Sequence, residues 1–155
     1  MVYDFLQVKR IQGYGLTHLP DYKSEYSSGM DICANFLDTD TEKALLISVG
    51  ERKLISTGLA IEIPVMFEGQ IRSRSGLAMH NGIIVLNSPG TIDSDFRGHL
   101  KIILANFGEE DYLIKQGDRI AQLVISKIVR PKIKLVEKLS NSKRGMKGFG
   151  STGIS

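Results

Sequence analysis

Short apolar runs, separated by turn residues at close spacing, constrain the fold of this chain more than any other feature. Most of the runs are rich in isoleucine and valine, and some alternate with polar residues, as in Ala60-Ile61-Glu62-Ile63. Branched side chains and alternation both suit a pleated strand. The expected strands are 5–11, 44–47, 58–63, 68–73, 83–86, 100–106, 112–114, 120–127 and 133–136. With one short helix expected at 75–80, the pattern predicts an all-β sandwich, jelly roll or barrel.

The size and charge of the chain exclude several classes of protein. Its 155 residues, 42% hydrophobic and 24% charged, suit one globular domain. A net charge of +3 is too small for the basic face of a duplex-DNA binder, so no nucleic-acid partner is expected. No run approaches the roughly 20 apolar residues of a membrane span, and the start lacks a signal-peptide layout. The single cysteine, Cys33, cannot form an intramolecular disulfide. We expect a soluble cytoplasmic protein without a membrane partner.

The last residues differ from the rest of the chain. After Leu139 the sequence is glycine, serine and basic residues, with little apolar side chain to bury. We therefore expect a β domain over 1–139 and a flexible arm over 140–155 that orders only against a ligand or a neighbour. Composition alone favours the plainer alternative, a disordered tail without a role.

Polar residues interrupt the strand pattern in five clusters, and the first is 28–34. There Asp31 follows a glycine turn and enters a strand. Taken alone, Asp31 is more readily interpreted as a turn-capping residue than as part of a metal site. Cys33 is interpreted as a small buried side chain rather than a nucleophile, because no basic partner lies near it in the sequence.

The second cluster, 72–78, combines two arginines with Ser75 and Gly76, which would open the short helix. The first N–H groups of a helix can bind an anion, and guanidinium groups suit phosphate oxygens. An N-capping serine beside surface arginines explains the local sequence equally well.

The third cluster, 87–98, is expected to form an extended hairpin loop. It holds an amide, a glycine, two carboxylates and an aromatic ring, which could read a base, orient a water and pack on a sugar. A turn without function is the alternative, and it accounts less well for Ile92 and Phe96, which are apolar residues inside a polar loop.

The fourth cluster, 117–123, places Gln122 in an apolar strand, where a buried amide needs a hydrogen-bond partner. Its Asp118 and Arg119 are expected to stabilise the turn or an interface.

The fifth cluster, 144–153, is rich in glycine, basic residues and hydroxyl groups. Its backbone N–H groups could fold round phosphates, although the spacing is not that of a Walker A loop. The histidines show no spacing typical of zinc ligands, so no zinc site is expected.

Together and in this order, the five clusters resemble the five motifs of the homotrimeric dUTPase family. The motifs are SGMDICA, RSGLA, PGTIDSDFRG, GDRIAQL and RGMKGFGSTG, and they span residues 28–153. The resemblance implies a jelly-roll-like distorted β-barrel subunit with one short helix and a flexible arm. It implies a homotrimer with shared active sites, in which the arm reaches over a neighbour's site. It also implies Mg²⁺-dependent cleavage of dUTP to dUMP and pyrophosphate, which limits uracil in DNA and supplies dUMP.

The same resemblance assigns roles to single residues. Asp93, rather than Asp95, would be the general base that deprotonates the water attacking the α-phosphorus. Asp31 would hold water ligands of a Mg²⁺ ion bound chiefly by the phosphates. The residues expected to bind the substrate are Arg74, Ser75, Gly76, Asn87, Gly90, Ile92, Phe96, Gln122, Arg144, Phe149, Gly150 and Ser151.

The resemblance also implies which part of the nucleotide each of these residues would contact. Asn87 and the backbone from Gly90 would bind the uracil edge in a pocket too tight for the thymine methyl. Phe96 would lie against the deoxyribose, and Phe149 would stack on uracil from the arm. Arg144 would approach the γ-phosphate.

The chain departs from the usual family pattern at three positions. Phe96 stands where tyrosine is commoner, Ser73 replaces a proline, and Met66 occupies a position where glycine is frequent. None of these changes removes a group that the chemistry needs, so an active enzyme is expected.

Two other functions remain possible on this scaffold. A dCTP deaminase shares the fold, but Ile103 lies about where that family needs a glutamate as proton shuttle. A regulatory nucleotide-binding protein could use an inactive version of the fold, and it would have little reason to keep Asp93 and Arg144.

Overall fold

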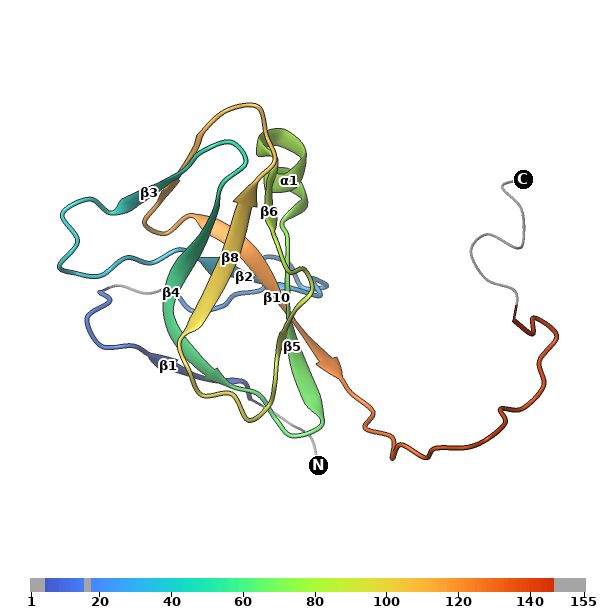
Figure 1. Ribbon diagram of the computed structural model, residues 1–155. Coiled ribbons are helices and arrows are strands. Elements are labelled where there is room, and N and C mark those ends of the chain that lie inside the picture. The colour runs from blue at the N-terminus through green and yellow to red at the C-terminus, as the bar shows by residue number, and fades with distance from the viewer. Residues whose placement is uncertain (1–4, 16–17, 147–155) are drawn as a thin grey trace.

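The computed structural model describes residues 5–15 and 18–146. Over these residues the chain forms ten strands and one helix (Figure 1). In chain order the elements are β1 (Gln7–Arg10), β2 (Met30–Cys33), β3 (Ala44–Ile47), β4 (Arg52–Glu62), β5 (Phe67–Arg72), α1 (Ser75–Asn81), β6 (Ile83–Val85), β7 (Gly90–Ile92), β8 (Leu100–Asn106), β9 (Tyr112–Lys115) and β10 (Arg119–Lys127). The prediction of an all-β subunit with one short helix is confirmed.

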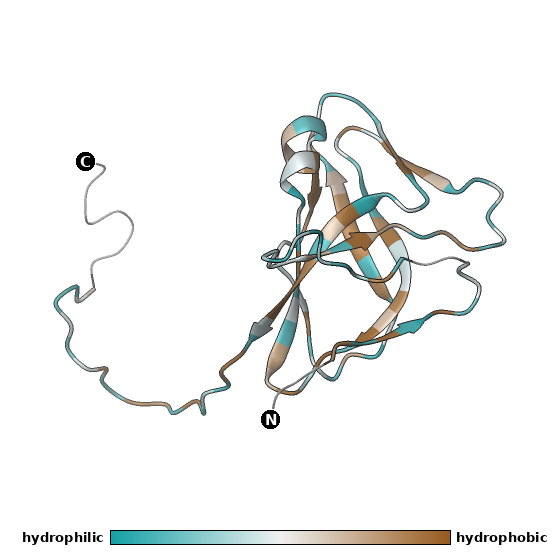
Figure 2. Ribbon diagram, turned by 180° about the vertical axis from the view of Figure 1, so that it is seen from behind, coloured by the Kyte–Doolittle hydropathy of each residue, from teal (hydrophilic) through white to brown (hydrophobic). Residues whose placement is uncertain are grey.

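The described strands form three antiparallel sheets rather than one closed barrel. One sheet has the order β1-β4-β8-β6, the second has the order β2-β10-β5-β7, and β3 pairs with β9. Their inward side chains meet in one apolar core, in which Ile32, Ile55, Leu104 and Leu123 are almost completely buried. Figure 2 shows the apolar residues gathered along the strands of the body. No helix in the described part of the chain has the length and apolar character needed to cross a membrane.

Most expected strands are present, with some differences in their bounds and number. β4 begins at Arg52, six residues earlier than the expected start at Gly58, because its first half pairs along β8. Residues 90–92, expected to lie in a loop, form β7 against β5. Residues 30–33 form β2, as the entry of Asp31 into a strand suggested.

The expected strand at 133–136 is wrong for this single chain. Residues 128–146 run outward as an arm that leaves the body from the end of β10 (Figure 1). Ile133 and Leu135 are 99% and 97% exposed. The alternation of apolar and basic residues suits a strand, but a strand also needs a neighbour to accept its backbone hydrogen bonds.

Helix α1 matches its expected position, and the backbone conformation of Gly82 ends it. Gly82 adopts a left-handed conformation, with φ of 65°, and its N–H donates to Ala78 O at 3.2 Å. Glycine accepts this conformation at the end of a helix without steric penalty. The helix is thereby stopped just before β6, and its first residue, Ser75, is set at the end of β5.

The backbone conformation at Met66 explains why glycine is frequent at this position in the family. Its φ is 70°, the only positive φ of a non-glycine residue in the described chain. Its carbonyl accepts the Ile128 N–H at 2.9 Å, which ties this turn to the start of the arm. A side chain in the left-handed region is strained, which is the physical reason for glycine at such a site.

Met66→Gly is expected to stabilise the fold by about 0.5–1 kcal/mol. Relief of roughly 1–2 kcal/mol of left-handed strain exceeds the entropy that glycine loses on folding, and the half-exposed side chain contributes little burial. Chemical denaturation followed by circular dichroism measures the change. The neighbouring Val65→Gly, at an exposed site without a positive φ, should destabilise instead. Equal losses in both variants would contradict the strain at Met66.

Candidate anion-binding site

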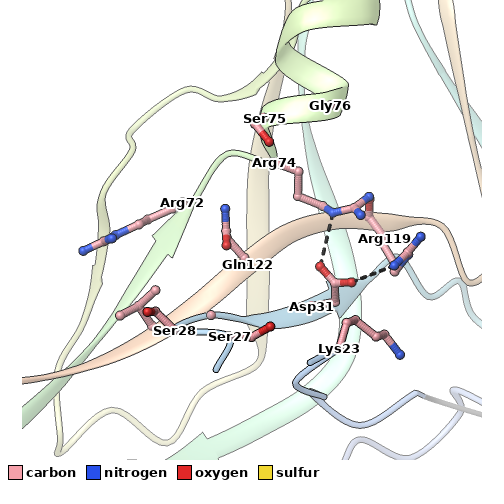
Figure 3. Close-up of a pocket in the computed structure, with 12 residues that line it drawn as sticks. Lys23, Ser27, Ser28, Asp31, Arg72, Arg74, Ser75, Gly76, Arg119 and Gln122 are labelled. Carbon is pink, nitrogen blue, oxygen red and sulfur yellow. Dashed lines mark hydrogen bonds and ion pairs between the residues drawn. The ribbon is translucent and has the colours of Figure 1, made fainter. Parts of the chain in front are cut away.

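A polar pocket of about 390 Å³ opens where β2, β10 and the start of α1 meet (Figure 3). Its lining contains four basic side chains and one carboxylate, together with hydroxyl groups and an amide. An excess of positive charge in a concave site favours an anionic ligand with several charged oxygens. The lining residues are Lys23, Ser27, Ser28, Gly29, Asp31, Arg72, Arg74, Ser75, Gly76, Arg119, Gln122 and Val124.

The register of the second sheet places three of these side chains in one row. Gln122 in β10 lies opposite Asp31 in β2 on one side and opposite Arg72 in β5 on the other. Residues aligned across a sheet project from the same face. Asp31, Gln122 and Arg72 therefore start from one row of the sheet at the pocket, although 91 positions separate Asp31 from Gln122 in the sequence. The Arg72 guanidinium group turns along its own strand and donates to Gln70 Oε1, so that it points away from Asp31 (Figure 3).

Asp31 is held by two arginines. Its Oδ1 lies 3.2 Å from Arg74 Nε, and its Oδ2 lies 3.0 Å from Arg119 Nη1 (Figure 3). Arg74 Nη1 also donates to the carbonyl of Arg119 at 2.8 Å. The Asp31 side chain is only 13% exposed. Asp31 is therefore a paired carboxylate at the pocket wall, and its interpretation as a simple turn cap does not describe these contacts.

The start of α1 supplies the opposite wall. Arg74 is the N-cap residue, in an extended conformation with no side-chain cap hydrogen bond, and Ser75 is the first helical residue. Ser75 therefore does not act as the N-cap, the alternative that the sequence left open. The Ser75 hydroxyl and Gly76 are exposed at the pocket, where the first N–H groups of a helix point outward.

Gln122 has the partner that a buried amide requires. Its Nε2 donates to the carbonyl of Ser73 at 2.9 Å, which leaves Oε1 beside Gly29. A Cβ atom at Gly29 would lie 2.7 Å from that oxygen. The backbone of the 28–34 cluster can approach the amide this closely only because residue 29 is glycine.

The third cluster lies outside this pocket. Gly90 and Ile92 belong to β7, at the opposite edge of the second sheet from β2. Asp93, Asn87 and Asp95 are exposed, and the Phe96 ring, 40% exposed, lies over Gly98. None of the described residues of this cluster lines the pocket of its own chain. The structure thus brings together Asp31, Arg74, Ser75, Gly76 and Gln122, but leaves the expected base-reading residues and Asp93 apart.

The arm is described as far as Met146. Arg144 lies in it and is not a lining residue of the pocket. Phe149, Gly150 and Ser151 lie outside the described residues.

Arg119 lines the pocket, although nothing in the sequence indicated that it would. It was expected, together with Asp118, to stabilise an interface or the turn before β10. Asp118 stabilises that turn, since its Oδ2 accepts the Lys115 N–H at 2.8 Å. Arg119 instead faces the pocket, because of a break in the strand register that the sequence does not show. Lys23 and Ser27 also line the pocket and carried no recognisable signal.

Cys33 lies beside the pocket as a partly exposed thiol. Burial raises its pKa, and the negative charge of Asp31 raises it further, against smaller opposing effects of nearby basic groups. A raised pKa keeps the thiol protonated near neutral pH, so its chemistry is not that of an activated nucleophile.

The pocket has too few ligand side chains to bind a metal ion directly. Among the described residues, no group of three or more His, Cys, Asp or Glu side chains could hold one, and Asp31 is the only carboxylate of the lining. A cation that keeps several water ligands and takes others from a bound phosphate chain fits such a site, and that is the habit of magnesium.

An all-β subunit with a basic, hydroxyl-lined pocket of this kind defines a polyanion-binding protein. A family model described as dUTPase matches residues 16–153. The chain is 49% identical over 149 residues to the deoxyuridine 5'-triphosphate nucleotidohydrolase of Rickettsia bellii (strain OSU 85-389), covering 96% of this chain and 95% of the relative. It is 48% identical to the enzyme of that name from Caldanaerobacter subterraneus subsp. tengcongensis, covering 96% and 97%. The chain therefore belongs to the dUTPase family.

A solved structure shows the same fold. The Staphylococcus bacteriophage 80alpha dUTPase with dUPNHPP superposes with a TM-score of 0.84 at 28% identity, covering 97% of this chain and 99% of the phage chain. The resemblance that the five motifs indicated is thus confirmed.

Gly29→Ala is expected to weaken binding of the analogue dUPNHPP about fivefold to tenfold, because the new methyl group displaces the Gln122 amide and removes about one hydrogen bond. Calorimetric titration measures the affinity. In a Gln122→Ala background, where the colliding oxygen is absent, the same change should cost less than about twofold. An undiminished loss in that background would contradict the proposed collision.

Proposed function

We propose that this chain hydrolyses dUTP to dUMP and pyrophosphate by attack of water on the α-phosphorus. Its membership of the dUTPase family supports this activity, since curated relatives at about half identity are named for it. The observation that carries the proposal is the row of Asp31, Gln122 and Arg72 beside the start of α1. That row offers both positive charge and a single carboxylate, which suits a triphosphate accompanied by a divalent cation.

The phosphate chain would lie along the basic wall of the pocket. Arg74 and the exposed Ser75 and Gly76 would donate to its oxygens, and the Gln122 amide would contact it from the floor. Ser75 lies at the helix start, where a hydroxyl and nearby N–H groups can act on one phosphate. These groups stabilise the charge that develops as the α–β bond breaks.

Magnesium would enter with the triphosphate, held by its oxygens and by water contacts to Asp31. The lining supports this arrangement because its one carboxylate cannot supply a coordination sphere. When bound, the ion would neutralise phosphate charge. A dUTPase of the same fold, from phage phi11 of S. aureus, coordinates a structural Mg(II) ion; for this chain the argument rests on the donor set.

The third cluster would supply uracil recognition and the general base. Asn87 and the backbone from Gly90 to Ile92 would bind the uracil edge, and Phe96 would pack on the deoxyribose. Asp93, exposed at the end of β7, would accept a proton from the attacking water. A phenylalanine at position 96 keeps the steric exclusion of a 2′-hydroxyl while lacking a phenol oxygen.

These two half-sites support a homotrimer with shared active sites. In a single chain the third cluster does not line the phosphate pocket, so another subunit would have to bring its own Asp93 there. The arm points to the same assembly, because Ile133, Leu135 and Leu139 are almost fully exposed in the isolated chain. Exposed apolar side chains in series are normally covered by a partner.

The charge of the arm suits a lid over phosphates. Residues 128–155, which follow β10, carry seven lysines and arginines and one glutamate, a net charge of +6, whereas the rest of the chain carries −3 of the total of +3. Arg144 would approach the γ-phosphate, Phe149 would stack on uracil, and Gly150 and Ser151 would close the site over the nucleotide.

Two alternative functions are less well supported. Ile103 is an aliphatic residue in β8 and cannot shuttle a proton, which argues against dCTP deamination. A purely regulatory nucleotide-binding protein would not need Asp93.

Pyrophosphate release from dUTP, measured with Mg²⁺ beside dCTP, dTTP and UTP, separates these functions. Strong preference for dUTP supports hydrolysis, whereas ammonia release from dCTP at a comparable rate, or no release at all, would contradict it.

Asp93→Asn is expected to lower kcat for dUTP about 10²–10⁴-fold, because an amide cannot take the proton from the attacking water. Binding of dUPNHPP should change by less than about threefold, since the side chains are of equal size. Asp95→Asn, an equally exposed change in the same loop, is the matched control and should cost far less. A larger loss of kcat at Asp95 would reassign the base, and a parallel loss of affinity at Asp93 would show a binding role.

A further inference from the structure

Arg119 reaches the pocket through a break in the β10 ladder. From Ala121 to Leu123 the strand pairs regularly with β2, but the register shifts between Arg119 and Ala121, so that Arg119 rather than Ile120 lies opposite Cys33. Ile120 and Ala121 are consecutive and both buried. This extra residue puts Arg119 and Gln122, three positions apart, on the same face of the sheet. A bulge beside a site commonly redirects a side chain in this way.

The two arginines that hold Asp31 are not in equivalent positions. Arg74 precedes α1, next to Ser75, and lies against the wall where phosphate would bind. The Arg74 side chain is 26% exposed, and its guanidinium group contacts both Asp31 and the Arg119 carbonyl. Arg119 is 48% exposed and contacts the other carboxylate oxygen, Oδ2, from the β10 side. Each oxygen of Asp31 thus has its own guanidinium partner.

We propose that Arg119 is a positioning residue for Asp31, and that Arg74 exchanges Asp31 for phosphate oxygens when the nucleotide enters. The inference rests on the proposed function, because it assigns each arginine a part in triphosphate binding. In the free protein, the two guanidinium groups more than offset the single negative charge of Asp31, so a divalent cation alone gains little there. Once Arg74 turns to the phosphate chain, Arg119 still holds Oδ2 and leaves Oδ1 directed at the water ligands of the incoming ion.

The geometry also indicates what removal of Arg119 would do. Without it, Oδ2 loses its partner and the Asp31 carboxylate can rotate to take both oxygens to Arg74, in the bidentate arrangement that guanidinium groups favour. Asp31 would then present its oxygens poorly to the ion's water ligands. The loss should therefore fall on the magnesium-dependent part of nucleotide binding. Uracil recognition and the general base belong to other residues and should be unaffected.

Calorimetric titration of dUPNHPP into the full chain, with Mg²⁺ and separately with EDTA, tests this assignment. In Arg119→Gln, the gain in affinity that Mg²⁺ gives should shrink about tenfold to a hundredfold, the usual effect of removing a residue that orients a metal-associated ligand. Affinity in EDTA should change by less than about threefold. Arg119→Lys should recover part of the magnesium effect. Arg52→Gln removes an equal charge from an exposed position in β4 outside the pocket and should leave both affinities unchanged.

Manganese provides a second readout that does not depend on turnover. Electron paramagnetic resonance of Mn²⁺ with the wild-type chain should show tight binding only when dUPNHPP is present. Tight binding of Mn²⁺ without nucleotide would overturn the exchange. Equal losses of affinity with Mg²⁺ and with EDTA in Arg119→Gln would make Arg119 a direct phosphate ligand, and no loss in either would make its contact with Asp31 a surface ion pair. Either result overturns the positioning role. A wild-type chain that binds dUPNHPP but releases no pyrophosphate would instead contradict the proposed function.

Discussion

The register of β10 between β2 and β5 is the constraint on which the site depends. It aligns Gln122 with Asp31 on one side and Arg72 on the other, while Leu123 and Ile71 point into the core. A slip of one residue would exchange these faces, burying charged groups and exposing apolar ones. The packing of the hydrophobic core therefore fixes the positions of Asp31, Gln122 and Arg72 at the pocket, because it fixes the register of the strands that carry them.

The same geometry limits what one chain can do alone. The second sheet carries the basic pocket towards its β2 edge and presents β7, with Asp93 beyond it, at the other edge. The groups proposed to bind phosphate and those proposed to bind uracil therefore lie apart in one subunit. In the proposed trimer, each interface would join one subunit's pocket to a neighbour's loop and so form three equivalent sites. The same assembly would cover the exposed apolar residues of the basic arm.

Local patterns predicted the parts of the fold that local physics controls. Runs of isoleucine and valine located most of the core strands, the helix expected at 75–80 is present as α1, and the unusual Met66 coincides with a strained φ. Features that depend on how strands pair with one another could not be predicted as well from the sequence. The strand expected at 133–136 lacks a neighbour in one chain, and β7 forms only because β5 lies beside it. The contact of Arg119 with Asp31 could not be predicted, because the shifted register that turns Arg119 towards Asp31 arises from pairing with β2 and leaves no mark in the sequence.

The most direct test of the shared site is recovery of activity by mixing two inactive variants. Arg74→Ala damages the phosphate pocket and Asp93→Asn removes the proposed base, so neither homotrimer should turn over dUTP efficiently. After the two are unfolded together and refolded as mixed trimers, a shared site predicts that about a quarter of the sites combine an intact pocket with an intact loop. Pyrophosphate release should return to about that fraction of the wild-type rate. If the mixture stays as inactive as its components, although native mass spectrometry shows mixed trimers, then each site is built within one chain and the account is wrong.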